Sequence, residues 1–450
     1  ELGAQLLARG IFSQGSAPSS GVPKAPSSAM KAPTSPRTAS KITAATINLT
    51  KNLIGAGIFT LPSALRDGTV LPGLMVMMMV GLVQASTFIL IAFLCQKLNV
   101  TTYRGAMVAV FGKRTGNLVD GAILLNCVFG CVSYNILVAD FLEKAIHGLL
   151  GHYVSRSMLI WTCTLLVTLP LSHARNLSPL RVTSVLGLGI IAYVFSYVLS
   201  DFLRNIETGA ENLQAVACRP SIHLFSTMAL CTGAFQAHYN SPRIFMELGC
   251  DLRAHAMTVL CSFGMVFMVY STFAVSGLGL FGEGVKGNVL KNYPSEGNSY
   301  ILAAWFGMAL SVLCTYPLVF TTGRESLIGM VPALQRFRKA NDQQAHVVIT
   351  TTMICSIATV ACLFEDVSFI SGMLGATAGA GLCWIFPASI YLKASAEGQE
   401  QPLSESLLGR GPKAAAQIQR IPALACYAKC VVLVGFLSMT VGIAKTWGLL

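Results

Sequence analysis

The sequence predicts an all-α polytopic membrane protein with about eleven transmembrane helices, arranged as an inverted five-plus-five repeat with broken first and sixth helices. Three observations favour this fold class. Hydrophobic residues make up 54% of the chain and charged residues 11%, whereas a soluble domain carries about 25% charged residues. Apolar runs long enough to cross a bilayer recur along the chain. Two of these runs, the first and the sixth, carry glycine in their middle.

The apolar runs are recognised by their length, because a helix that crosses a membrane needs about 20 apolar residues. Several runs are longer than this, so we expect some helices to be tilted. The eleven runs lie near 42–65, 71–95, 118–149, 156–173, 182–201, 221–247, 254–282, 298–322, 345–364, 367–394 and 424–448.

The first run, Lys41–Leu65, is built unlike a plain membrane helix. Gly55 and Gly57 flank Ala56 at its centre. Glycine weakens helix propagation, and backbone groups released at membrane depth must find partners inside the protein or in a water-filled cavity. A helix broken there presents main-chain N–H and C=O groups and two half-helix ends, which suits a zwitterionic solute or an ion. Close packing of two helices through their glycines is the alternative interpretation.

The sixth run, 221–247, repeats this feature. It is interrupted by Thr232-Gly233-Ala234 at its middle and by Ser241-Pro242 near its inner end. Broken first and sixth helices, with five spans in each half, are typical of inverted-repeat transporters. A half-helix N-terminus attracts a carboxylate, and free carbonyls attract an ammonium group or a cation. The chemistry of two such breaks therefore suits an α-amino acid.

The distribution of Lys and Arg predicts a cytosolic N-terminus. In that orientation 22 of the 31 basic residues lie on inner segments and 8 on outer ones, with Lys51 inside the first run. Such an excess is typical of cytosolic loops. We therefore expect a multi-pass protein of the plasma membrane or of a vacuolar or lysosomal membrane, with its C-terminus on the outer side after eleven crossings.

The chain divides into a tail, 1–40, and a transporter domain, 41–450. The tail is rich in Ser, Pro, Ala and Lys, and no acidic residue lies between Glu1 and Asp67. This composition is typical of a disordered cytosolic tail, and a targeting peptide shares it. Because the first residue is glutamate, we expect a fragment or a processed form.

Composition and motifs argue against other classes of protein. The net charge of +12 is not gathered on a basic face with aromatic platforms, so we expect no nucleic-acid partner. Most of the 14 cysteines lie in or beside apolar runs, which indicates core residues rather than a metal site or a disulfide framework. No Gly-x-Ser-x-Gly elbow, Walker glycine loop or His-Glu-x-x-His helix is present, so we expect no enzyme, no metal site and no cofactor.

Four segments resemble the amino acid/auxin permease family. They read NLTKNLIGAGIFTLPSAL in the first span, FQAHYNSPRIFMEL in the sixth, TYPLVFTTGRESL in the eighth and EDVSFISGMLGATAGAGLCWIFPASIYL in the tenth. The resemblance covers 41–450 and is nearest to the neutral amino acid and vacuolar amino acid transporter branches. It implies eleven spans, an inverted five-plus-five core and secondary transport of amino acids.

The same resemblance implies roles for individual residues. The amides of Gly55-Ala56-Gly57 match the segment that holds the substrate carboxylate. The carbonyls of Gly233-Ala234-Phe235 match the segment that meets the amine, with Phe235 as a gate. Thr315 matches a threonine implicated in sodium binding in sodium-coupled members.

The sequence departs from the sodium-coupled pattern at Lys51, where those members carry asparagine four residues before the first glycine of the break. An ammonium at this position replaces the cation permanently, or takes part in proton coupling. Asn48 or Asn52 is the remaining candidate ligand for sodium. The alternative is that Lys51 snorkels toward the cytosolic face. The coupling ion is thus expected to be H⁺, with Na⁺ doubtful.

Polar residues elsewhere in the spans have two interpretations each. Asn126 and Tyr134 in the third span either line the cavity or bridge packed helices. His238 either holds helices together through hydrogen bonds, which we favour, or carries a proton. Arg324 and Glu325 form an inner-gate ion pair or a plain interfacial anchor.

Near the outer end of the third span, Asp140 and Glu143 lie close to Lys144 in the sequence. We interpret these charged residues as a solvated rim.

The sequence therefore predicts a monomeric transporter of small neutral L-amino acids that works by alternating access and is proton-coupled or facilitative. The alternative is a membrane amino acid sensor, which binds the same solute without net transport.

Overall fold

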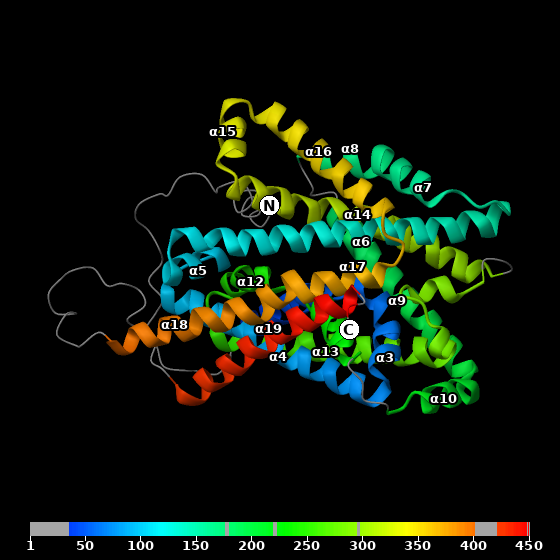
Figure 1. Cartoon of the computed structure of the whole chain (residues 1–450), viewed down its shortest axis with the longest axis horizontal. Helices are drawn as coiled ribbons and strands as arrows, with labels where there is room; N and C mark the ends of the chain where they lie inside the picture. The colour runs from blue at the N-terminus through cyan, green and yellow to red at the C-terminus, as the bar shows by residue number, and fades with distance from the viewer. Residues whose placement is uncertain are drawn as a thin grey trace.

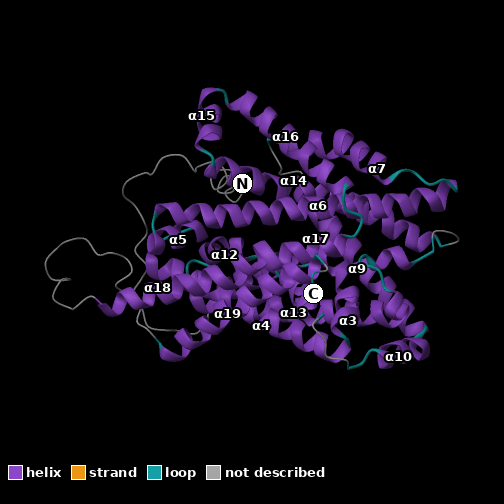
Figure 2. Cartoon of the chain, in the orientation of Figure 1, coloured by secondary structure: helices purple, strands orange, loops and turns teal. Residues whose placement is uncertain are grey.

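The computed structural model describes residues 36–175, 180–218, 223–294, 298–400, 421–447 and 449, and these residues contain helices and loops but no strand (Figure 2). The predicted all-helical membrane fold is confirmed. Most of the predicted tail, 1–35, lies outside the described residues.

Eight helical stretches of the described residues are long and apolar enough to cross a membrane. They contain α4 (Val70–Leu98), α6 (Gly116–Leu150), α9 (Leu180–Arg204), α13 (Leu252–Phe281), α14 (Ser299–Met330), α16 (Asp342–Cys362), the continuous run α17 (Val367–Leu374), η7 (Gly375–Ile385) and α18 (Phe386–Glu400), and α19 (Pro422–Thr446).

Three further spans are assembled from short pieces. The first is α2 (Pro36–Leu53), η1 (Ala56–Thr60) and α3 (Leu61–Gly68); the fourth is α7 (Arg156–Cys163), η3 (Thr164–Thr168) and α8 (Leu169–His173); the sixth is α11 (Leu224–Ala234), η4 (His238–Asn240) and α12 (Ser241–Glu247). These three segments and the eight long stretches together occupy the positions of the eleven predicted spans within the described part of the chain.

Short helices lie at the two ends of the bundle (Figure 1). One end carries α5 (Tyr103–Phe111) and α15 (Pro332–Ala340), and the opposite end carries α10 (Ile206–Ala215). The remaining short elements are η2 (Lys113–Thr115), η5 (Gly282–Gly284) and η6 (Val289–Asn292). The α5 and α15 helices fall on loops predicted to be inner, and α10 falls on a loop predicted to be outer.

The helices pack in two groups that meet around the broken spans. In one group α13 packs against α2, α3 and α4, and in the other α14 packs against α6 and α9. At the junction the buried ring of Phe59 makes edge contacts with Phe141 of α6 and Phe273 of α13, at ring-centroid distances of 5.7 and 6.0 Å. Aromatic edge contacts of this kind stabilise a packed core beyond the burial of their area.

Large apolar side chains also cover the outside of the bundle. Leu166 and Leu433 are more than 70% exposed, and Met268 is 64% exposed. Exposed apolar side chains on many spans are what lipid contact requires of a membrane protein.

The first span is broken where the sequence predicts. Helix α2 ends at Leu53, Gly55 is extended with φ −127° and ψ −164°, and a short 3₁₀ turn precedes α3. The proline at the second position of α3 suits a helix start, because that position needs no intrahelical N–H bond.

The sixth span is broken slightly later than predicted. Thr232 and Gly233 lie in the last turn of α11, and the non-helical segment begins after Ala234. Gly233 serves close packing instead, because a Cβ there would lie 3.2 Å from the Ser371 carbonyl oxygen and from a methyl of Leu374. Gly233 is therefore a packing glycine, and the break itself is formed by Phe235–Ala237.

Candidate functional site

The two breaks lie directly against each other. A Cβ built on Gly57 would stand 3.4 Å from Cα of Ala234, so the main chains of the first and sixth spans are in van der Waals contact. Helix α11 ends here at Ala234, while α3 begins a few residues after Gly57. The site thus brings a half-helix C-terminus and the start of another half-helix together, where partial negative and partial positive charge face a common point.

Tyr270 of α13 joins the two breaks through its hydroxyl. The oxygen lies 2.6 Å from the Leu53 carbonyl oxygen and 3.2 Å from that of Ala234. Tyr270 is not among the site residues predicted from the sequence, although a tyrosine in the middle of an apolar run needs a buried partner for its hydroxyl.

The carbonyl groups at the end of α11 are largely engaged by protein donors. The Gln84 side-chain amide of α4 donates to the Thr232 carbonyl at 3.0 Å, and the amides of Phe235 and Gln236 bond to the Cys231 and Gly233 carbonyls. The Gly57 amide, by contrast, has no acceptor among the described residues. The main-chain donor at the first break is therefore the group most open to a ligand, and it suits a carboxylate.

Phe235 is fully buried at the centre of the site. Its ring stacks on Phe263 at 6.0 Å and meets Tyr270 edge-on at 5.1 Å. A Cβ on Gly81 of α4 would lie 3.6 Å from the tip of the same ring. The side chain fills the space between α4 and α13, so displacing it requires these helices to move.

His238 attaches η4 to α4. Its Nε2 lies 3.0 Å from the Thr87 hydroxyl and 3.1 Å from the Gln84 carbonyl oxygen, and its ring contacts Phe88 edge-on. The residue is fully buried, and its Nδ1 has no partner among the described residues. These contacts support the structural role, while the proton-carrying role stays a prediction.

Among the described residues, no hydrogen bond joins the predicted ion-coupling residues Lys51, Asn48, Asn52 and Thr315 to one another. Lys51 is half-buried in the last turn of α2 and makes no ion pair among the described residues, and Asn48 and Asn52 are exposed. Thr315 donates to the Ser311 carbonyl of its own helix at 2.8 Å. An ammonium at a helix C-terminus is favourable, because the terminal carbonyls carry partial negative charge.

The predicted cavity-lining residues lie on α6. Tyr134 and Asn126 are both half-buried. No hydrogen bond of the Asn126 side chain is found in the described part of the chain. Their role in lining a cavity stays a prediction.

The predicted ion pair between Arg324 and Glu325 is present, and both residues also have closer partners. Arg324 is 8% exposed and donates to the Thr350 hydroxyl of α16 at 2.9 Å, whereas its contact with Glu325 is 3.4 Å. The closer partner of Glu325 is Arg338 of α15, at 2.7 Å, and Arg338 also contacts Asp342. The hydrogen bond with Glu325 raises the pKa of Arg338. This network of contacts ties α14, α15 and α16 together, and its role as a gate stays a prediction.

The interpretation of a solvated rim is wrong for Asp140. Asp140 is 1% exposed, and its carboxylate contacts Arg156 of α7 at 2.5 Å, Lys291 of η6 at 3.2 Å and the Asn288 side-chain amide at 3.3 Å. The partners lie 16 and about 150 residues away in sequence, so local pattern gives no sign of them. A buried carboxylate needs such charge partners.

Residues 282–294, here named the lid loop, connect α13 to the segment before α14 and cover the first break. Val289 and Leu290 are fully buried, and η6 contacts η1. Lys144 of α6 also donates to the Tyr293 carbonyl, so the lid loop contacts both η1 and α6.

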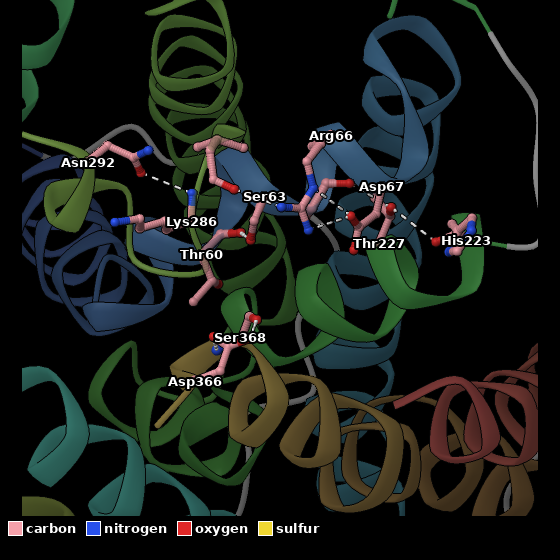
Figure 3. A network of polar contacts seen from close by, with 12 residues as sticks. Thr60, Ser63, Arg66, Asp67, His223, Thr227, Lys286, Asn292, Asp366 and Ser368 are labelled. Carbon is pink, nitrogen blue, oxygen red and sulfur yellow. Dashed lines mark hydrogen bonds and ion pairs between the residues drawn. The ribbon is translucent and has the colours of Figure 1, made fainter. Parts of the chain in front are cut away.

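Figure 3 shows the opposite edge of the lid loop, beside α3. Arg66 donates to the Val285 carbonyl at 2.7 Å and pairs with Asp67 at 2.8 Å. Within the loop, the Lys286 amide donates to the Asn292 side chain at 2.9 Å. These contacts attach the lid loop to α3 on the predicted outer side.

Comparisons with known proteins agree with this architecture. Residues 38–401 match the family described as transmembrane amino acid transporter protein. The chain is 27% identical to "Amino acid transporter AVT6B" of Arabidopsis thaliana, over 78% of this chain and 81% of that protein. It is 23% identical to "Vacuolar amino acid transporter 2" of Saccharomyces cerevisiae, over 76% and 74% of the two chains. It is 26% identical to human "Sodium-coupled neutral amino acid transporter 7", over 77% and 78%.

Solved structures show the same fold. The manganese transporter of Eremococcus coleocola superimposes with a TM-score of 0.55 at 11% identity, covering 93% of this chain and 90% of that one. The inward-facing conformation of Mhp1 superimposes with a TM-score of 0.51 at 13% identity, covering 90% and 91%. The predicted fold class is confirmed, and the chain belongs to the family of transmembrane amino acid transporter proteins.

Proposed function

We propose that this protein is a secondary active transporter of small neutral L-amino acids that works by alternating access. The observation that carries this proposal is the contact between the two breaks, where Gly57 meets Ala234 and Tyr270 touches the main chain of both. The carboxylate would bind the amides at Gly55–Gly57, and the amine would bind the carbonyls of Leu53 and Ala234. Both halves of a zwitterion are recognised by main-chain groups, as broken helices allow.

The packing around the breaks supports a small neutral substrate. The neighbours of the site are the aromatic rings of Phe235, Phe263 and Tyr270 and the small residues Gly57 and Ala234. None of these residues carries a charge that would pair with an acidic or basic substrate side chain. A tightly packed apolar site discriminates chiefly by volume.

We propose that transport is driven by protons or is facilitative and does not require sodium. Lys51 stands at the C-terminus of α2, where a bound sodium ion would otherwise meet the terminal carbonyls. The relatives include proteins named as sodium-coupled and as vacuolar transporters, so the family name leaves the ion open.

Lys51→Asn tests the role of this ammonium. If the Lys51 ammonium replaces a bound cation, the variant without it needs a cation at that position. Uptake by the variant is therefore expected to become sodium-dependent. Uptake is measured in proteoliposomes with sodium replaced by an organic cation at fixed pH. Lys41→Asn, an exposed lysine at the start of the same helix, is the control and is expected to leave coupling unchanged. Normal rates and unchanged ion dependence in Lys51→Asn would contradict this role.

The direct test of the proposed function is counter-flow in proteoliposomes, with sodium and pH varied independently. Liposomes preloaded with unlabelled alanine are expected to accumulate labelled alanine, and small neutral amino acids are expected to compete. Binding without exchange would instead identify a sensor and overturn the proposal.

The protein is an integral membrane protein of the amino acid transporter family. We propose a cytosolic N-terminus, residence in the plasma membrane or a vacuolar or lysosomal membrane, and function as a monomer. The excess of basic residues on the predicted inner loops supports the orientation.

A further inference from the structure

The Tyr270 hydroxyl occupies the carbonyl groups that the amine of an amino acid would need. Its oxygen lies 2.6 Å from the Leu53 carbonyl oxygen and 3.2 Å from the Ala234 carbonyl oxygen, at the ends of the two half-helices. A hydroxyl that donates to carbonyl oxygens resembles an ammonium group in this respect. Tyr270 therefore makes the contacts that the substrate amine is proposed to make with the breaks.

The Tyr270 hydroxyl satisfies the Leu53 and Ala234 carbonyls less completely than a substrate ammonium group would. A phenol has one proton, so it donates to either the Leu53 or the Ala234 carbonyl at one time. An ammonium group has three donors and satisfies both carbonyls together. Hydrogen bonds that involve a charged donor are also about twice as strong as neutral ones. The substrate can thus displace the hydroxyl, and the hydroxyl can re-form its hydrogen bonds with the carbonyls after the substrate leaves.

The ring of Tyr270 keeps the hydroxyl at this position. The residue is fully buried, and its ring lies edge-on to Phe235, which is itself stacked on Phe263 of the same helix. A rigid ring with few rotamers holds its hydroxyl in one place at low entropic cost. Moving the hydroxyl away from the breaks therefore requires α13 and the broken spans to shift relative to each other, which is the motion that alternating access requires.

We propose that Tyr270 is a positioning residue that substitutes for the substrate when the carrier returns without one. This inference rests on the proposed transport function. The hydroxyl would hold the two breaks together during the substrate-free return step and would compete with the amine during binding. A carrier that lacks the hydroxyl would bind its substrate more tightly but would return without substrate more slowly.

Tyr270→Phe tests the proposal, because it removes the hydroxyl and keeps the ring. The half-saturation concentration for exchange is expected to fall about three- to tenfold, the factor that one net hydrogen bond supplies. Exchange at saturation is expected to persist, since exchange does not use the substrate-free return. Net uptake into empty liposomes is expected to slow several-fold relative to exchange. If the hydroxyl only stabilised the fold, Tyr270→Phe would lower the rates of exchange and net uptake by the same factor.

Tyr103→Phe is the matched control. Tyr103 is also buried, and its hydroxyl also donates to a main-chain carbonyl, that of Leu382, at 2.8 Å. It lies on α5, outside the breaks, so the ratio of net uptake to exchange is expected to stay at the wild-type value. Equal ratios in Tyr270→Phe, Tyr103→Phe and the wild type would overturn the proposal.

A second substitution at the same position covers the case in which Tyr270→Phe folds poorly. A 3-fluorotyrosine at position 270 keeps the ring and makes the hydroxyl a stronger donor, so the half-saturation concentration is expected to rise. An unchanged or lower value would count against competition. Absence of exchange in the wild type would reject the proposed transport function itself, and this outcome is distinct from unchanged ratios in an active carrier.

Discussion

Gly375→Ala is expected to abolish both transport and stable folding. A Cβ on Gly375 would lie 1.7 Å from the Ala229 carbonyl oxygen and 2.9 Å from the Gly233 amide nitrogen. These two groups are the acceptor and donor of one turn of α11, so the clash is with backbone and cannot be relieved by a side-chain rotation. Overpacking costs about 1–3 kcal/mol where side chains can move, and a backbone overlap exceeds that range.

The experiment compares Gly375→Ala with Gly264→Ala. Gly264 lies in α13, and a Cβ there would meet no atom within 4 Å, so this control tests the substitution without the clash. Monodispersity after detergent extraction and uptake in liposomes are measured for both. The control is expected to resemble the wild type, since alanine favours the helix by up to about 1 kcal/mol. A folded, active Gly375→Ala protein would show that α11 and η7 are not packed as described.

Asp140→Ala is expected to lower the free energy of unfolding by about 3–5 kcal/mol, as removal of one partner of a buried ion pair does. The loss leaves Arg156 and Lys291 without the carboxylate that lies between them. The lid loop then loses its contact with α6 through η6, so transport is expected to fall and the loop to become accessible. Thermal unfolding in detergent and limited proteolysis within 282–294 measure the two effects.

A double substitution separates charge from packing. Asp140→Ala together with Lys291→Ala removes one of the uncompensated cations, so the pair is expected to destabilise less than the sum of the single substitutions. Glu247→Ala is the control for an ion pair that is solvent-exposed, since its contact with Arg243 has both side chains about half exposed. That control is expected to cost no more than about 1 kcal/mol. Equal losses for Asp140→Ala and Glu247→Ala would contradict the buried cluster.

The sequence predicts the spans and the first break because both depend on local composition. Apolar length alone identifies the spans, and Gly55 and Gly57 mark the place where α2 stops. The family membership follows from motifs that lie in and beside these breaks. Such local signals predict the structure well, because every backbone N–H and C=O group inside a membrane needs a hydrogen-bond partner.

The remaining features depend on contacts between distant segments. Gly233 has the same local signature as the glycines of the first break, yet it serves close packing against α17 and η7, which begin more than 130 residues later. The contacts of Tyr270 and Asp140 are likewise with residues on other helices, which the local sequence does not reveal. The close approach of η7 to α11 at Gly375 is also a contact between distant segments.

If main-chain amides at the first break hold the substrate carboxylate, substrate binding must protect them from solvent. Hydrogen exchange of the segment 54–60, measured on the protein in lipid nanodiscs, reports this protection. A transported L-amino acid is expected to slow exchange at Gly57, whereas the amine that lacks only the carboxylate is expected to have no effect there. Equal effects of both compounds, or no protection of 54–60 in protein that accumulates the amino acid, would contradict the account.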